Sequence, residues 1–123
     1  MIDYNNLNWQ TYKNINDVSD KVDFIYGCHS LEHVQDISSL QKRFLEILNI
    51  NGWIFWEVPN GSVESNGGCN GQLVVPHTYY FTTKYFNSLP FKVILNQAND
   101  IGSFPNIPSA KGQVIRCLSN RIS

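Results

Sequence analysis

Two short apolar runs, separated by about twenty-five residues, restrict the folds open to this chain more than any other feature. The first, "KVDFIYGC" (Lys21 to Cys28), is rich in β-branched and aromatic residues and stops at Gly27. The second, "WIFWEV" (Trp53 to Val58), is apolar until Glu57 and is ended by Pro59, which has no N–H to give to a strand ladder. Near-continuous apolar runs of this length predict two buried strands.

The segment between the two runs has the pattern of a helix. Asp36 is placed to cap its start, and Gly52 in "NING" to stop it. Apolar residues recur at helical spacing between these points: Ile37, Leu40, Phe44, Leu45, Ile47 and Leu48. Strand, helix and strand in this order predict a right-handed parallel βαβ unit.

A polar, glycine-laden stretch from Asn60 to His77 follows the second strand, in the position where loops form ligand sites. Thr82 and Thr83 can cap a short helix through Leu89. Beyond it, "FKVILNQ" and "GQVIRCL" (Gly112 to Leu118) read as two strands joined without a helix, so they should pair antiparallel. We therefore predict an α/β fold, a parallel βαβ unit followed by a C-terminal antiparallel hairpin.

The length and charge of the chain exclude several classes of protein. With 123 residues we expect one domain over residues 1–123, in which 1–20 form a lead segment. A net charge of -1 without a basic cluster argues against a nucleic-acid surface. No run is apolar enough for a bilayer and the N-terminus lacks a secretory pattern, so we expect a soluble, cytoplasmic protein. Cys28, Cys69 and Cys117 have no paired spacing and are expected as reduced thiols.

The stretch "GCHSLEHV" contains His29, Glu32 and His33 in the order H-x-x-E-H, the spelling of a zinc-peptidase motif. Such a site needs a third ligand, and the main downstream carboxylates are Glu46, on the helix, and Glu57, inside a strand. A zinc hydrolase is therefore a minor alternative, and we predict no metal ligands. In the other interpretation, His33 packs between strand and helix with a ring nitrogen bonded to the backbone.

Three quoted segments together resemble a known family: "VDFIYGCHSLEHVQD", "LNINGWIFWEVPN" and "HTYYFT". They are similar to the second half of class I S-adenosylmethionine-dependent methyltransferases that act on small molecules, in the group with the pattern "fDlI…h.LEHv.d…l.pgG.l.i.vPN…H..fFt". The match spans about Val22 to Leu95. In such enzymes this half supplies the fourth to seventh strands, so the resemblance implies a partial Rossmann-like methyltransferase fold.

The resemblance also implies roles for individual residues. Those that would border S-adenosylmethionine are Tyr26, Gly27, Cys28, His29 and Glu32. Those that would lie toward the substrate are Pro59, Asn60, His77 and Tyr80. His29 and His77 are candidate bases, since imidazole is neutral near pH 7 unless perturbed. The alternative for His77 is a structural role, packed with neighbouring aromatic residues. The alternative for Tyr80 is a position in the core.

The first half of that family's pattern has no counterpart here. The twenty residues before the first strand contain no glycine, so the glycine-rich turn that meets the cofactor is absent, as is the strand whose acidic end binds ribose. We expect S-adenosylmethionine to bind the isolated chain weakly or not at all.

In the full fold the strand Val22 to Cys28 is central, so here it would expose an apolar edge. This predicts a homodimer or a complementing chain, with Leu7 to Ile15 folded over part of the gap. The alternative function is a catalytically inactive binding or assembly domain that uses this edge and the "NGGCNG" loop. The methyl acceptor stays open.

Overall fold

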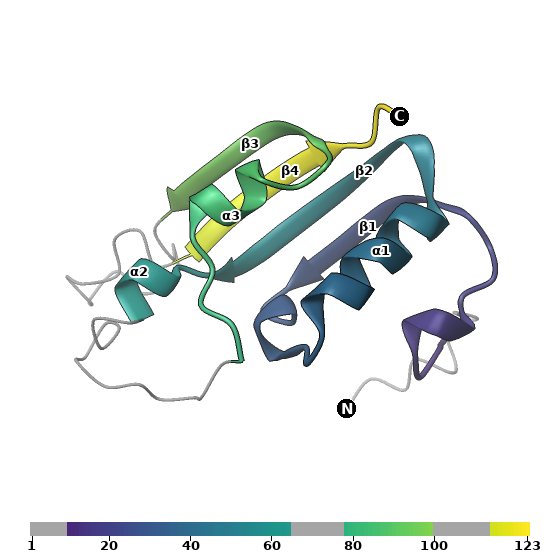
Figure 1. Cartoon of the computed structure of the whole chain (residues 1–123), viewed down its shortest axis with the longest axis horizontal. Coiled ribbons are helices and arrows are strands. Elements are labelled where there is room, and N and C mark those ends of the chain that lie inside the picture. Colours follow the sequence, from purple (N-terminus) through teal and green to yellow (C-terminus); the bar gives the residue numbers. More distant parts are fainter. Residues whose placement is uncertain (1–9, 65–77, 100–113) are drawn as a thin grey trace.

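The computed structural model describes residues 10–64, 78–99 and 114–123, and these build a four-stranded sheet with strand order β1-β2-β4-β3 (Figure 1). The strands are β1 (Val22–Cys28), β2 (Leu48–Pro59), β3 (Lys92–Asn99) and β4 (Val114–Asn120). β1 and β2 are parallel, whereas β4 is antiparallel to both β2 and β3. The predicted parallel βαβ unit and antiparallel hairpin are both confirmed, and β4 inserts beside β2.

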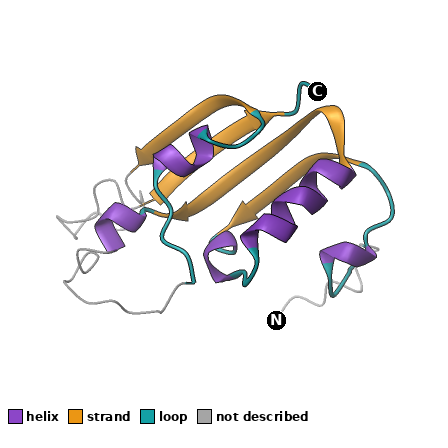
Figure 2. Cartoon of the chain, in the orientation of Figure 1, coloured by secondary structure: helices purple, strands orange, loops and turns teal. Residues whose placement is uncertain are grey.

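Helices cover a single face of this sheet (Figure 2). α1 (Ile37–Ile47) lies over β1 and β2, and α3 (Thr83–Asn87) lies over β3 and β4. The described chain also has three shorter helical elements: η2 (Ile15–Asp17), η3 (Leu31–His33) and α2 (Gly61–Glu64). The Nε2 of Gln41 in α1 donates to the hydroxyl of Tyr85 in α3 at 3.2 Å, which joins the two larger helices. None of the described helices is long and apolar enough to cross a membrane.

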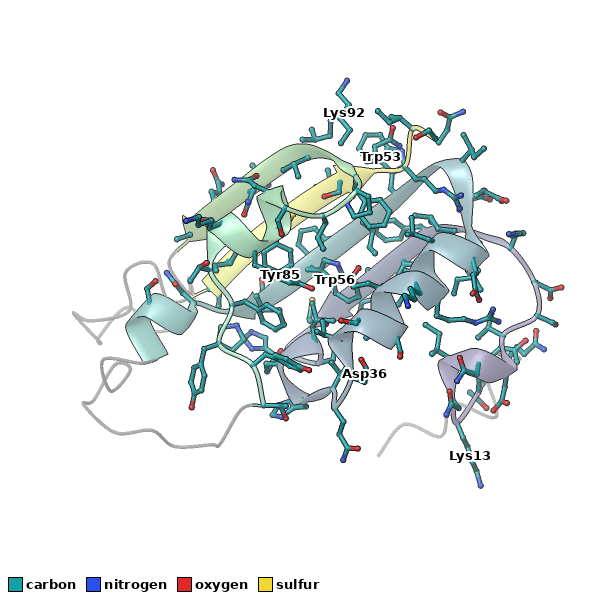
Figure 3. The ribbon with its side chains drawn as sticks, viewed as in Figure 1. Lys13, Asp36, Trp53, Trp56, Tyr85 and Lys92 are labelled. Atoms are coloured by element: carbon teal, nitrogen blue, oxygen red, sulfur yellow. The ribbon has the colours of Figure 1, made fainter. Side chains whose placement is uncertain are left out.

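The core lies between these helices and the sheet. Trp56 in β2 is buried against Phe44 of α1, with ring centroids 5.2 Å apart, and Figure 3 shows Trp56 within this layer. A methyl group on Gly27 of β1 would come within 2.4 Å of Cζ3 of Trp56. Gly27 is therefore needed where the indole crosses the neighbouring strand, which is a packing reason for a glycine that the family resemblance assigns to the cofactor.

The start of α1 agrees with the prediction, but its end does not. Asp36 caps the helix, because its Oδ1 accepts from the backbone N–H of Ser39 at 3.1 Å. The helix stops at Ile47, five residues before Gly52, because β2 already begins at Leu48. The prediction of Gly52 as the helix stop is therefore wrong.

Residues 48–52 enter β2 because they have distant partners. Asn51 adopts a left-handed conformation with φ 67°, and its N–H donates to the carbonyl of Arg121 at 2.6 Å. The Arg121 guanidinium in turn donates to the carbonyls of Leu45 and Leu48, at the helix end. Arg121 thus satisfies carbonyls at the end of α1 in the way that a glycine cap otherwise would.

The two predicted strands are buried on one face only. In β2, Ile54, Trp56 and Val58 are buried, whereas Trp53 on the opposite face is exposed. β1 lies at the edge of the described sheet and exposes four of its seven side chains, namely Asp23, Phe24, Tyr26 and Cys28. Among the described residues, the prediction that the second run is covered on both sides is therefore wrong, and so is the prediction that the first run is a buried strand.

The lead segment packs beside α1. Ile15 joins the edge of the core, and the Arg43 side chain of α1 donates to the carbonyls of Ile15 and Val18. The expected folding of 7–15 over the strand edge stays a prediction, and residues 7–9 lie outside the described part. α3 begins after Thr82 as predicted and ends two residues before Leu89.

We predict that Gly27→Ala lowers the free energy of unfolding by about 1–3 kcal/mol, because the buried Trp56 ring must move to admit the methyl group. Urea unfolding followed by tryptophan fluorescence measures this loss. Cys28→Ala, at the exposed neighbouring position, is the matched control and should change stability by no more than about 0.5 kcal/mol. Equal stability of Gly27→Ala and the unmodified protein would contradict the packing explanation.

Candidate functional site

Three polar side chains meet where β1 and β2 end and β4 begins. His29 follows β1 directly, Glu57 is the partner of Cys28 in β2, and Arg116 is the partner of Glu57 in β4. Nε2 of His29 lies 3.1 Å from Oε1 of Glu57, and Nε of Arg116 donates to Oε2 of Glu57 at 2.7 Å. The Glu57 carboxylate thus contacts both His29, which follows β1, and Arg116 of β4.

The charges of Arg116 and His29 decide the protonation state of Glu57. Partial burial alone would raise the pKa of the carboxyl, but the hydrogen bond and charge of Arg116, with a smaller contribution from His29, outweigh it. The pKa of Glu57 therefore lies below its usual range, and the group is an anion near neutral pH. An anion can only accept, so a neutral His29 donates from Nε2 and keeps Nδ1 as the acceptor.

The backbone conformation directs the His29 side chain toward Glu57. His29 has φ 48°, in the left-handed region, and its N–H donates to the carbonyl of Glu57 at 2.9 Å. A non-glycine residue in that region is uncommon and is held by its surroundings. The ring is about half exposed, with its side chain at 45% of the maximum.

Glu32 is the one buried acidic side chain of the described residues, 1% exposed. Neither carboxylate oxygen has a hydrogen-bond donor among those residues. Oε1 lies 3.8 Å from Nδ1 of His29 and 3.8 Å from Nε2 of His33, too far for hydrogen bonds but close enough for charge attraction to a ring that is protonated. Buried polar groups normally have hydrogen-bond partners, so the carboxylate of Glu32 is an exception among the described residues.

His33 does not occupy the packed position that the sequence suggested. Its side chain is 48% exposed, so the prediction of an imidazole packed between strand and helix is wrong. The short 3-10 turn η3 instead turns Leu31 and Glu32 inward. The predicted helical turn is confirmed, but its buried charge is the carboxylate.

The segment that precedes α3 lies against this turn. The N–H groups of Thr78 and Tyr79 donate to the backbone carbonyl of Glu32, at 2.9 and 3.2 Å. The N–H of Gly61 donates to the carbonyl of Phe81 at 2.6 Å, and a methyl group on Gly61 would meet that oxygen at 2.7 Å. The ends of β1 and β2 and the start of α3 therefore form one connected unit.

The residues expected at the cofactor are divided between two faces. Tyr26 is 66% exposed on the face opposite the helices, stacked on Phe24 with ring centroids 6.3 Å apart. Cys28 is exposed, and burial together with the Glu57 charge raises the pKa of its thiol despite Arg116. Cys28 is thus held as a neutral thiol, which is a weak nucleophile. Within the expected set, Nδ1 of His29 and Oε1 of Glu32 lie 3.8 Å apart.

The residues expected at the substrate lie nearby. Pro59 is the last residue of β2 and pairs with Val114, and Oδ1 of Asn60 accepts from the N–H of Ser62 at 3.1 Å. Tyr80 is exposed in the segment that crosses Gly61. His77, the second candidate base, lies outside the described residues.

No group of three His, Cys, Asp or Glu side chains among the described residues is arranged to hold a metal ion. His29 and His33 flank the same oxygen of Glu32 and do not share a helix, because η3 is only three residues long. The geometry that the zinc alternative requires is therefore not formed by these residues.

Sequence reasoning missed the roles of Glu57 and Arg116. Each is a charged residue inside an otherwise apolar strand, which is a signal in itself. Their pairing could not be read from the sequence, because it depends on the register of β2 with β4, which joins residues 59 positions apart.

No protein-family model matches the chain, and no curated protein matches it. Among solved structures, the chain is similar to the crystal structure of TehB from Haemophilus influenzae, with a TM-score of 0.60 at 15% identity. The alignment covers 90% of this chain and 40% of that chain, so this chain spans less than half the length of TehB. The likeness shows a methyltransferase-like fold.

We predict that Glu57→Gln destabilises the protein by about 1–2 kcal/mol near pH 7, because the charged partner of Arg116 is lost. Because the pKa of Glu57 is lower in the folded protein, its ionised carboxylate stabilises the fold at pH values above the unfolded-state pKa, near 4.5. That stabilisation is lost as the pH falls through the folded-state pKa. The difference from the unmodified protein should therefore shrink between pH 5 and pH 3 in urea unfolding.

The control is Glu46→Gln, which removes an exposed ion pair with Arg43. It should change stability by no more than about 0.5 kcal/mol, since exposed pairs contribute little. A Glu57→Gln difference that stays constant down to pH 3 would refute the linkage.

Proposed function

We propose that this protein binds S-adenosylmethionine at the carboxyl ends of β1 and β2 and takes part in methyl transfer when a second chain completes the site. The observation that carries the proposal is His29, which lies between two carboxylates at the mouth of a parallel strand pair in a methyltransferase-like fold. Ligands of open α/β sheets bind at this end of the strands.

The residues present fit part of such a cofactor. Glu32 is buried with both oxygens lacking a donor, and the amine and hydroxyl groups of S-adenosylmethionine are donors. When bound, the cofactor supplies the electrophilic methyl group. Residues 1–20 contain no glycine, and tight binding of the cofactor needs contacts beyond those that Glu32 and His29 offer.

His29 is suited to remove a proton from a methyl acceptor. Glu57 accepts from Nε2 and fixes the ring, which leaves Nδ1 as the basic atom. A base oriented by a carboxylate in this way is a recurring arrangement in enzymes that activate a hydroxyl or amine. Methyl transfer otherwise depends on holding the nucleophile and the methyl group in line, for which η3 and residues 78–81 form one side.

A second candidate function is a binding or assembly domain without catalysis. The observation that favours it is the exposed aromatic pair Phe24 and Tyr26 on an unpaired strand edge of the described sheet. Apolar surface of that kind is typical of protein interfaces.

Calorimetry with S-adenosylmethionine and with its demethylated product tests the proposal. We expect measurable binding to the unmodified chain at high protein concentration. Glu32→Ala should weaken it at least tenfold, about 1.4 kcal/mol, because an acceptor for the cofactor is lost.

The matched control is Glu46→Ala, an exposed carboxylate on the far end of α1, which should leave the affinity unchanged. Circular dichroism establishes that each variant is folded. Absence of binding by the unmodified chain and by its assembled form would refute the cofactor proposal and leave the assembly function.

A further inference from the structure

We infer that the outer edge of β1 pairs with β1 of a second copy of this chain, antiparallel and centred on Ile25, to make one continuous sheet. The inference names the second chain of the proposed function, but it stands on the geometry of the strand itself. A dimer that fails to bind S-adenosylmethionine would overturn the proposed function alone.

The backbone of β1 presents a usable hydrogen-bonding edge. The N–H of His29 donates to Glu57 in β2, so the backbone groups of Ile25 and Gly27 turn toward β2 as well. Alternation then directs the N–H and C=O of Phe24, Tyr26 and Cys28 outward, where no described strand meets them. Such a row of unpaired groups is a template for another strand.

The side chains of β1 fit self-pairing in one register. A two-fold axis at Ile25 places Phe24 opposite Tyr26 of the second copy, so that the outward groups of these residues face one another. The Phe24 and Tyr26 rings already stack with an interplanar angle of 4°. Self-pairing extends this stack to four rings on the open face, and aromatic cross-strand pairs stabilise sheets.

Charge does not oppose this register. Asp23 is the single charged side chain of β1, and Oδ1 of Asp23 accepts from Asn49 at 2.8 Å. In the register centred on Ile25, Asp23 lies opposite Gly27 of the second copy, so that the two carboxylates stay apart. Lys21 of the second copy lies opposite His29, which places the interface at the border of the candidate site.

The opposite edge of the sheet is protected in a way that β1 is not. β3 carries an irregularity between Val93 and Leu95, where two steps along β3 match one along β4. Its first residue is Lys92. A bulge and a lysine are features that natural edge strands use to block further pairing. β1 has an irregularity of its own between Val22 and Phe24, but from Phe24 to Cys28 it pairs regularly and contains no lysine.

Light scattering after size-exclusion chromatography tests the dimer. We expect the unmodified chain to give twice the 14.1 kDa of one chain. Tyr26→Pro removes an outward N–H and leaves the pairing with β2 intact, so this variant should be monomeric and folded. Tyr26→Val keeps the N–H and should retain the dimer, and Ile94→Lys, at the other edge, should retain it as well.

A cross-link tests the register independently of the proline variant. Ile25 residues across the axis form a non-hydrogen-bonded pair with Cα atoms about 4.5 Å apart, within the range of a disulfide. In a Cys28→Ser, Cys69→Ser background, Ile25→Cys should give a covalent dimer on oxidation, and Asp23→Cys should not. A monomeric unmodified chain, a dimer that survives Tyr26→Pro, or no preference for Ile25→Cys would overturn the proposal; the first would leave the edge to another chain.

Discussion

The burial of Trp56 against one layer of helices is the constraint from which the rest of the described structure follows. Its indole lies beside Phe44 and crosses β1 at Gly27, where no larger residue fits. Side chains alternate along a strand, so Trp56 facing the helices obliges Glu57 to leave the core. The strand pair then brings Glu57 beside His29 and Arg116, so that packing on one face positions the polar row on the other.

His29 consequently lies between two different carboxylates. Glu57, on the open face, is paired with Arg116 and remains an anion near neutral pH. Glu32, on the helix side, is buried without a donor among the described residues. Glu57 fixes the His29 ring through Nε2 at 3.1 Å. Oε1 of Glu32 lies 3.8 Å from Nδ1, which is longer than a hydrogen bond. This asymmetry makes Nδ1 the atom available to a ligand.

The sequence was sufficient for features that depend on local pattern. The apolar runs, the Asp36 cap and the helix after Thr82 could all be predicted, since burial and capping are recorded in neighbouring residues. The end of α1 could not, because it depends on a contact between Asn51 and Arg121, which lie far apart in the sequence. The pairing of Glu57 with Arg116 likewise depends on strand register.

The turn after β1 likewise combines a feature that the local sequence predicts with one that depends on contacts made elsewhere in the chain. "LEH" correctly predicted a helical turn, yet which of Glu32 and His33 is buried depends on the turn being 3-10 and on the contact of its carbonyl with Thr78 and Tyr79. A charged residue is ordinarily the one assigned to solvent. Here the backbone contact holds η3 with the carboxylate inward, and the imidazole, which is less costly to bury, is left exposed.

The edge of β1 and the candidate site are physically continuous, and this links assembly to ligand binding. Cys28 directs its backbone to the free edge and is the register partner of Glu57, and His29 follows it immediately. A strand paired on both sides has less freedom than one paired on a single side, so pairing at the edge restricts the backbone that carries His29. A ligand that requires a fixed His29 would then bind the paired form more tightly, and by linkage would favour pairing. The proposed cofactor binding and the proposed dimer would thereby be steps of one equilibrium.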